Sequence, residues 1–585
     1  MNIFAELDAK VRATLDALKA DGSLLSDLDL AGIEVQEPRD PSHGDAALNA
    51  AMVLAKRAQK KPREIAELIA ARLADDAQIA AVDVAGPGFI NVRFEPTVWE
   101  ALVADIFARG TDFGRSDFGA GRSVQVEYVS ANPTGPMHIG HCRGAVFGDA
   151  LAAVLAAVGY DVTREYYIND AGAQVDKLGQ SAVLRYREAL GEDIGQIPEG
   201  LYPGDYLKPV GETLKERYGD ALLAKSEPEQ ISTARDAAID LMMDMIRSDL
   251  GALGVRHDVF FSERSLNTGD RDQVAEAIAV LRDEGLIFEG LLPRPKGHDE
   301  DDWEEREQTL FRSTEFGDDM DRALMKSDGT YTYFANDVAY HYNKVERGFD
   351  QMFNVLGADH IGYIPRIKAA VAALSGGKAD FQTPVCNLVK VMRNGEPVRM
   401  SKRAGTFVEL RDVVDEVGRD PVRFMMLMNK SDTPIDFDLA KVVEQSRDNP
   451  VFYVQYAHAR LASVFRKAAD QFPELALTHL KSQSIAMVRL SDDGEQDLLR
   501  QVSRYPRLLL MAAREREPHR LPRYLFDLAS ALHAQWGRGN DNPALRFIRE
   551  DDPALTKARL QLMICVQTVL ASGLDILGVD APDTM

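Results

Sequence analysis

Cysteine is scarce in this sequence. The 585 residues include only three, Cys142, Cys386 and Cys565, and no two of them form a CxxC pair. This scarcity excludes a disulfide framework and a zinc site built from thiolates, and it is typical of proteins in a reducing compartment. We therefore expect a cytoplasmic protein.

Long apolar runs are also missing. No stretch of eighteen or more apolar residues occurs, so the sequence predicts no membrane-spanning helix and no membrane partner. The first residues, MNIFAELDAKVRATLDAL, indicate an amphipathic helix and lack the basic and apolar regions of a secretion signal. With 45% hydrophobic and 27% charged residues, the composition is that of an ordinary globular protein.

Positive charge is in deficit, with a formal net charge of −24. This argues at first against a nucleic-acid partner, but salt screens exposed charges beyond about 8 Å, so a local basic face matters more than the total. One such stretch runs from Arg500 to Arg523 and contains seven arginines and only two glutamates, with Tyr505 and His519 interspersed. Taken alone, the stretch favours a solvated helix face with salt bridges.

The length predicts three or four domains. Residues 1–112 combine two helical patterns with a short strand and indicate an α/β domain, in which Asp45 is expected near a helix N-terminus. Residues 113–437 form the predicted central domain, with a mostly helical, charged insertion at about 180–320. Residues 438–585 are helical throughout and predict a bundle.

The central domain begins with a strand–loop–helix–strand pattern. Residues 124–129 alternate like a strand, residues 144–158 predict a helix that ends at Gly159, and residues 161–168 predict a second strand. This order indicates a Rossmann-like parallel sheet, with the loop at its carboxyl edge, where helix amides face a ligand. Further strand-like segments are expected at 329–342, 351–363 and 386–405, so the fold class is α/β with a helical C-terminal bundle.

The loop itself reads NPTGPMHIGH, from Asn132 to His141. Its two prolines restrict the backbone, and Gly140 lets a ligand lie against it. His138 and His141 can both donate hydrogen bonds to charge developing on a leaving pyrophosphate. An isolated HxxH would more often only cap and solvate a helix, but the preceding strand, the glycine and the prolines favour a nucleotide site.

These residues resemble a known family. HIGH after a strand resembles the first motif of class I aminoacyl-tRNA synthetases, and VEYVSANPTGPMHIGHCRGAVFGDALA followed by YYINDAGAQ resembles the arginyl-tRNA synthetases in particular. Their second motif is of Lys-Met-Ser-Lys-Ser type, and the matching segment here is Arg399-Met400-Ser401-Lys402-Arg403, with arginine at its first and last positions. A basic surface turn is the alternative interpretation of this segment.

The resemblance implies an arginine–tRNA ligase. Such an enzyme uses ATP, with Mg²⁺ travelling on the nucleotide, to convert L-arginine to arginyl-adenylate, and it transfers the arginine to the 3′ end of tRNA(Arg). The resemblance also implies that activation requires bound tRNA. We expect a monomer with no metal site of its own.

Site residues follow from the resemblance position by position. Catalytic roles fall on His138, His141 and Lys402, whose compact cation pairs with the triphosphate, while Arg399 can add bidentate phosphate contacts. The ATP-binding residues are Asn132, Pro133, Thr134, Gly135, Pro136, His138, Gly140, His141, Gly357, Asp359, His360, Arg399, Met400, Ser401 and Lys402.

The arginine-binding residues implied are five. Glu127 and Asn132 hold the ammonium and carboxylate end, Tyr333 and Asp337, one helical turn apart, hold the guanidinium, and Gln174 lies nearby. Seen alone, Tyr333 is more simply a core aromatic residue and Asp337 an N-cap.

The helical tail supplies the expected tRNA contacts. NPVFYVQYAHARLASV, residues 449–464, resembles the start of the family's anticodon-binding bundle, and Tyr453, Tyr456, His458 and Arg460 offer the rings and charge that hold unstacked bases. A core aromatic stripe is the simpler alternative for Tyr453. HGDAALNAAMVLAK and AGPGFIN resemble the N-terminal domain that touches the tRNA body.

Two other functions stay open at this point. One is another class I aminoacyl-tRNA synthetase or a small HxGH nucleotidyltransferase, against which the arginine-pocket residues and the helical tail argue. The other is a non-catalytic tRNA-binding relative, against which His138, His141 and Lys402 argue. The acidic segment 298–307 is expected to be solvated surface or a mobile loop and not a metal site, because its carboxylates lack defined spacing. The sequence does not predict which anticodon bases are recognised.

Overall fold

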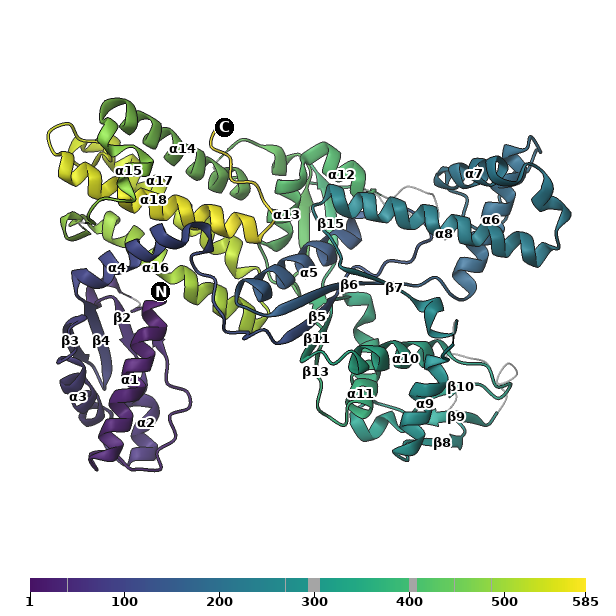
Figure 1. Cartoon of the computed structure of the whole chain (residues 1–585), viewed down its shortest axis with the longest axis horizontal. Helices are drawn as coiled ribbons and strands as arrows, with labels where there is room; N and C mark the ends of the chain where they lie inside the picture. Colours follow the sequence, from purple (N-terminus) through teal and green to yellow (C-terminus); the bar gives the residue numbers. More distant parts are fainter. Residues whose placement is uncertain (39, 269, 293–305, 399–407, 447, 486) are drawn as a thin grey trace. The chain divides into compact units, whose positions relative to one another are not determined.

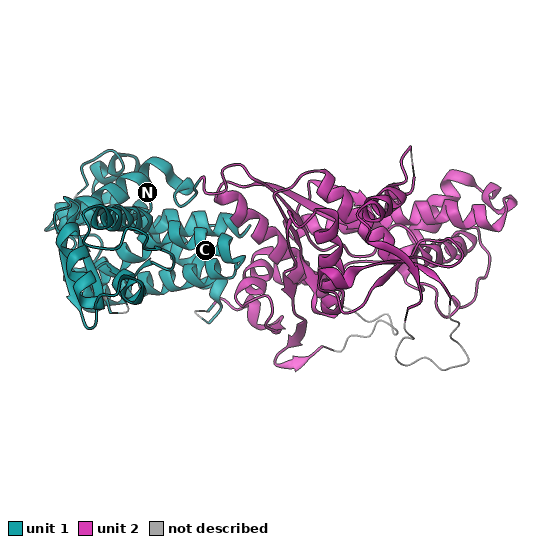
Figure 2. Ribbon diagram, turned by 90° about the horizontal axis from the view of Figure 1, so that it is seen from below, with its two compact units in different colours: residues 1–116, 446–585 teal, residues 117–445 magenta. Residues whose placement is uncertain are grey.

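The computed structural model describes residues 1–38, 40–268, 270–292, 306–398, 408–446, 448–485 and 487–585. They form two compact units, one of residues 1–116 with 446–585 and the other of residues 117–445 (Figure 2). The predicted first and last domains therefore share one unit. The predicted boundaries at 112/113 and 437/438 lie within a few residues of the divisions between the units and remain predictions.

The N-terminal part of the first unit is an α/β module. Its antiparallel sheet has the order β1-β2-β4-β3, with β1 Val35–Gln36, β2 Ala46–Leu48, β3 Ile79–Ala85 and β4 Phe89–Phe94. The helices are α1 Ile3–Ala20, α2 Ala50–Ala58, α3 Pro62–Leu73 and α4 Pro96–Arg109 (Figure 1). The predicted amphipathic first helix is confirmed, since α1 buries Phe4, Leu7 and Val11.

Asp45 is not at a helix N-terminus, so that prediction is wrong. The residues that follow it form β2 and pair with β4, which delays the helix to Ala50. The Asp45 carboxylate instead accepts a hydrogen bond from Phe94 N, 2.9 Å away.

The C-terminal part of the same unit is the predicted helical bundle. It contains α14 Pro450–Gln471, α15 Leu477–Leu480, α16 Asp493–Glu515, α17 Arg520–Asp541 and α18 Pro553–Ile576. Helix α18 packs against α14, α16 and α17. By length and composition α18, and α5 Ile139–Ala157 of the second unit, could each cross a membrane. However, 78% and 67% of their apolar windows are buried inside the fold, as expected of core helices.

The second unit is built on a parallel sheet of order β13-β11-β5-β6-β7. The strands are β5 Ser123–Glu127, β6 Asp161–Ile168, β7 Val259–Ser262, β11 Gln351–Asn354 and β13 Asp380–Gln382, and α5 Ile139–Ala157 joins β5 to β6. The predicted Rossmann-like pattern is confirmed. The strand order reverses between β5 and β11, which places a ligand crevice at their carboxyl ends.

The predicted insertion at about 180–320 contains both helices and strands. Helices α6 Ala173–Ala189, α7 Lys208–Tyr218 and α8 Glu227–Ala252 pack together, and α9 Gln273–Asp283 packs against α10 Tyr333–Glu346 (Figure 1). Strands β8 Ile287–Gly290, β9 Gln308–Phe311 and β10 Arg322–Met325 form an antiparallel sheet. Residues 298–305 of the acidic segment lie outside the described residues.

The strand-like segment predicted at 329–342 is wrong for most of its length, because residues 333–342 belong to helix α10. The side chain of Thr332 caps this helix by accepting from Ala335 N, and Phe334 and Val338 are buried one turn apart. The run of aromatic residues suggested a strand, but helical burial spacing and a threonine cap decide the local structure.

A smaller sheet of order β16-β15-β17 follows, with β15 Val389–Arg393, β16 Glu396–Pro397 and β17 Ile435–Asp438. The second unit also contains α11 Ile364–Leu374, α12 Leu410–Val417, α13 Arg419–Leu427 and the two-stranded pair β12 Leu356–Gly357 and β14 Val385–Cys386. The strand expected within 386–405 is confirmed for β15 and β16. Arg399, Met400, Ser401, Lys402 and Arg403 lie outside the described residues.

Candidate active site

The two histidines of the first motif lie together at the start of α5. His138 is the N-cap residue, and its Nδ1 accepts from Gly140 N at 3.1 Å, while Nδ1 of His141 accepts from His138 N at 3.3 Å. Their rings stack with centroids 3.9 Å apart. Both therefore cap the helix through Nδ1, and because Nε2 is on another edge of the ring, capping does not prevent either from donating to a ligand.

The loop before these histidines is packed closely. A Cβ on Gly140 would lie 2.8 Å from the His138 ring, and one on Gly135 would lie 3.1 Å from the ring and hydroxyl of Tyr206. The Tyr206 hydroxyl donates to the carbonyl oxygen of Thr134 at 2.8 Å. A side chain at Gly140 or Gly135 would therefore displace the His138 or Tyr206 ring.

The backbone is strained where β5 enters this loop. Val129 and Ser130 have φ values of 71° and 42°, in the left-handed region that a β-branched residue rarely adopts. The Ser130 hydroxyl donates to Glu127 Oε1 at 3.0 Å and accepts from Tyr167 N at 3.1 Å. These contacts hold the strained turn, which no sequence pattern predicted.

Glu127 belongs to a buried ion pair. Its Oε2 lies 2.5 Å from Nζ of Lys344, whose side chain is fully buried and also donates to Asn354 Oδ1 at 2.8 Å. The Asn354 amide in turn lies 3.0 Å from Nε2 of His341. The charge of Glu127 is thus matched from α10, and Lys344 is a site residue that the sequence analysis missed because its spacing along α10 resembles that of any surface lysine.

Asp337 lies one turn into α10. The pKa of its carboxyl is raised to about 7, mainly by burial and also by the charges of Glu263 and Glu127, while the hydrogen bond from the Tyr363 hydroxyl opposes this rise. The interpretation of Asp337 as an N-cap is wrong, since Thr332 caps the helix. A carboxyl group with a raised pKa is stabilised in its ionised form when a cationic ligand binds beside it, because the positive charge favours that form.

Tyr333 and Gln174 lie at the surface of the same region. Tyr333 is 70% exposed, so it is not a core aromatic residue, and a Cβ on Gly172 would lie 3.1 Å from its ring. Gln174, two residues further on, accepts from the Asn132 amide at 2.9 Å. The structure therefore brings Asn132 and Tyr333 to the start of α6, where Asn132 contacts Gln174 and Tyr333 lies beside Gly172.

Glu263 is a second missed residue. It follows β7 directly, is buried, and accepts from the Asn336 amide at 2.8 Å, while burial raises its pKa. A polar residue at the carboxyl end of a parallel strand would have been the signal for it, but no strand was predicted at residues 259–262.

The residues of GADH, from Gly357 to His360, lie at the same sheet edge. Val355 N donates to the Glu127 carbonyl at 2.8 Å, which places the following turn beside the end of β5. A Cβ on Gly357 would lie 2.4 Å from a side-chain oxygen of Asp359, so a larger residue there would displace the Asp359 carboxylate. Asp359 and His360 are exposed, and Nε2 of His360 lies 3.5 Å from Oδ2 of Asp359.

Residues 408–410, which follow the second motif in the sequence, bond to the backbone beside the first motif. Ile139 N donates to the Val408 carbonyl at 3.1 Å, and Leu410 N donates to the Met137 carbonyl at 2.8 Å. Val408 is six residues after Lys402 in the sequence.

Family models match three successive parts of the chain. The arginyl-tRNA synthetase N-terminal domain matches residues 5–94, the class I (R) tRNA synthetase catalytic domain residues 103–462, and the DALR anticodon-binding domain residues 454–585. Arginine–tRNA ligase from Xanthobacter autotrophicus is 60% identical over 585 residues, covering 100% of both chains. The ligase from Bradyrhizobium is 58% identical and covers 100% of this chain and 98% of that relative.

The chain belongs to the arginyl-tRNA synthetase family. Its activity is that of an arginine–tRNA ligase, and the alternatives of another class I enzyme or a non-catalytic relative are set aside.

Solved structures of this family share the fold. Arginyl-tRNA synthetase from Thermus thermophilus matches with a TM-score of 0.70 at 22% identity, over 99% of this chain and 100% of that one. The Plasmodium falciparum synthetase gives the same TM-score at 14% identity, over 100% of this chain and 99% of that one.

In the domain that matches the anticodon-binding model, three of the four predicted tRNA residues gather in one cluster. Arg460 lies over the rings of Tyr456 and Trp536, at 4.7 and 4.3 Å from their centres, and the Tyr453 ring lies tilted against that of His533, with centroids 4.4 Å apart. His458 is outside this cluster: it is buried, and its Nδ1 lies 2.9 Å from the Pro582 carbonyl.

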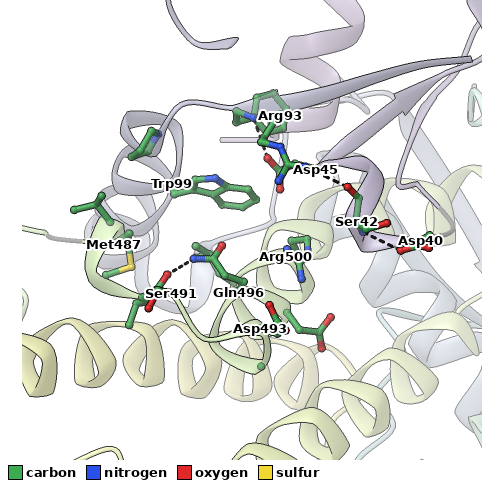
Figure 3. A pocket seen from close by; sticks show the side chains of 17 residues that line it. Asp40, Ser42, Asp45, Arg93, Trp99, Met487, Ser491, Asp493, Gln496 and Arg500 are labelled. Carbon is green, nitrogen blue, oxygen red and sulfur yellow. Dashed lines mark hydrogen bonds between the residues drawn. The ribbon is translucent and has the colours of Figure 1, made fainter. Parts of the chain in front are cut away.

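The basic stretch of α16 does not behave as a solvated helix face throughout. Arg504 pairs with Glu37 of the N-terminal module, and Arg507 lies 5.4 Å from the centre of the Phe4 ring, with a pKa lowered by burial. The start of α16 also borders a cavity of about 890 Å³ in the first unit, lined by Arg500, Asp45 and Trp99 among others (Figure 3). Part of the stretch therefore serves packing within the unit.

Proposed function

We propose that arginine is activated at the carboxyl ends of β5 and β11, between the first-motif histidines and α10. The arginine carboxylate attacks the α-phosphorus of ATP and releases pyrophosphate, and a terminal ribose hydroxyl of tRNA(Arg) then attacks the adenylate carbonyl and releases AMP. The protein needs no nucleophile for either step, only alignment and charge stabilisation. The observation that carries the proposal is the position of Glu127 at the end of β5: the strained turn after it leads to the His138–His141 pair, and its carboxylate pairs with Lys344 of α10, the helix of Asp337.

His138, His141 and Lys402 are the proposed catalytic residues. The imidazoles donate to oxygens of the departing pyrophosphate, and Lys402 supplies a point charge to the same group. The other proposed nucleotide contacts come from the first-motif loop, the Gly357–His360 turn and the segment 399–402. Mg²⁺ would arrive with ATP, and in the ranges that the structure describes no group of three or more His, Cys, Asp or Glu side chains could hold a metal ion.

A variant at His141 tests these roles. His141→Asn should lower kcat in tRNA-dependent ATP–pyrophosphate exchange by about 100-fold, because one donor to developing charge is lost. His138→Asn is the companion variant, since asparagine is a favoured N-cap and keeps the helix start. Wild-type kcat in both variants would remove the histidines from the mechanism.

For arginine recognition, the proposal assigns the guanidinium to Asp337 and Tyr333 and the ammonium and carboxylate end to Glu127 and Asn132, with Gln174 orienting Asn132. A guanidinium stays protonated at cellular pH and requires acceptors in its own plane. The buried, partly protonated carboxyl of Asp337 supports this assignment.

For tRNA, we propose that Tyr453, Tyr456 and Arg460 hold unstacked anticodon bases, with His458 shaping the C-terminal segment beneath them. Tyr456→Ala should weaken tRNA binding by about 1–3 kcal/mol, the worth of one stacked base. Tyr456→Phe keeps the ring and should lose much less. Filter-binding titrations of the two variants provide the measurement, and an equal loss in both would contradict stacking.

We also infer a cytoplasmic monomer with three domains, 1–112, 113–437 and 438–585. The three buried thiols support a reducing compartment.

A further inference from the structure

A buried arginine follows the first motif directly. Arg143, on the first turn of α5, is 1% exposed. Its Nη1 donates to the carbonyl oxygens of Thr433 and Asn387, at 2.6 and 3.1 Å, and its Nη2 donates to that of Lys430 at 2.7 Å. A cation buried against backbone carbonyls is costly unless several of them are satisfied at once.

The three carbonyls belong to two loops that lead into strands of the smaller sheet. Asn387 comes shortly before β15, and Lys430 and Thr433 come shortly before β17. These two strands pair in parallel, and β15 also pairs with β16. Arg143 therefore holds the beginnings of both parallel strands against the helix that carries His138 and His141.

The same helix start also holds the chain beyond the second motif. Residues 408–410 bond to the backbone of Met137 and Ile139, on the other side of the turn. Both described segments that flank residues 399–407 are thus attached to one turn of α5, one of them through the guanidinium of Arg143.

We propose that Arg143 is a positioning residue for adenylate formation, which sets the distance between the first-motif histidines and the β15–β16 hairpin. It does not touch the substrate and acts through the sheet that it anchors. The inference rests on the proposed nucleotide site at His138 and His141. Misplacing aligned groups by about 1 Å can slow a reaction about 100-fold even when the altered residue is remote.

Arg143→Lys is the variant that tests this, because lysine keeps the charge but cannot bridge two loops with a planar fork. Its kcat in tRNA-dependent ATP–pyrophosphate exchange should fall about 100-fold, with the arginine KM unchanged. Arg423→Lys is the matched control: Arg423 is also 1% exposed and also contacts α5, through Asp149 at 2.5 Å, and its Nη1 donates to the carbonyl oxygen of Leu253, at the end of α8. The control should lose thermal stability and keep kcat.

Asn387→Ala provides a milder second variant. The Asn387 amide donates to the Asp432 carbonyl at 3.0 Å and so joins the same two loops without a buried charge. It should lower kcat in the same direction, with the arginine KM again unchanged. The inference is overturned if Arg143→Lys slows exchange no more than Arg423→Lys, or, should Arg143→Lys not fold, if Asn387→Ala leaves kcat at the wild-type value. If one of these results is obtained while the His138 and His141 variants still lose kcat, the role of Arg143 is wrong but the proposed nucleotide site is retained.

Discussion

Lys344→Met should lower the free energy of unfolding by about 3–5 kcal/mol, because it leaves the Glu127 carboxylate buried without its counter-charge. Methionine has nearly the volume of lysine, so the loss comes from charge and not from a cavity. The Nζ of Lys344 is 2.5 Å from Glu127 and 2.8 Å from Asn354, and both contacts disappear. Denaturant unfolding of the wild type and the variant measures the difference.

The double variant Glu127→Gln/Lys344→Met separates folding from substrate binding. Removing both charges should restore most of the stability that Lys344→Met loses, since a neutral pair needs no counter-charge. The arginine KM of the double variant should be above the wild-type value, because the neutral amide no longer attracts the substrate ammonium. If the double variant recovers the wild-type KM as well, Glu127 serves only the fold.

Asp337→Asn should raise the arginine KM by about ten- to 150-fold, the equivalent of a charge-assisted hydrogen bond of about 1.5–3 kcal/mol. The ATP KM should change little, because Asp337 belongs to α10 and not to the first-motif loop. Steady-state exchange kinetics with each substrate varied in turn provide the measurement. Equal increases in both KM values would indicate a general disturbance of the site.

The same carboxyl should make arginine recognition depend on pH. The pKa of Asp337 is about 7 in the absence of substrate, so the ionised form that binds a guanidinium is gained as pH rises through 7 and lost as it falls. The kcat/KM for arginine should therefore drop about tenfold between pH 8 and pH 6. This inflection should be missing from Asp337→Asn, and its persistence there would assign it to another group.

Much of the fold could be predicted from local pattern. The strand at 161–168 matches β6 residue for residue, and the amphipathic α1 and the proline at the start of α3 are equally local signals. The segment that forms α10 could not be predicted, because its alternating aromatic residues suit a strand and only the Thr332 cap and tertiary burial decide otherwise.

Site residues that belong to a sequence motif could be predicted, whereas residues that reach the site only through tertiary packing could not. His138, His141 and Asp337 carry family patterns, but Lys344 and Glu263 became visible only when α10 and β7 were placed against β5 and β6. The left-handed turn at Val129 has no sequence signal at all, since valine is among the residues least expected there.

The most direct test of the pocket compares arginine with citrulline, which replaces the guanidinium by a neutral ureido group of the same shape. Inhibition constants for citrulline are measured against arginine in tRNA-dependent exchange, for the wild type and for Asp337→Asn. The wild type should prefer arginine by about 100-fold, and the variant should lose most of that preference. An unchanged preference in Asp337→Asn would contradict the assignment of Asp337 to the guanidinium.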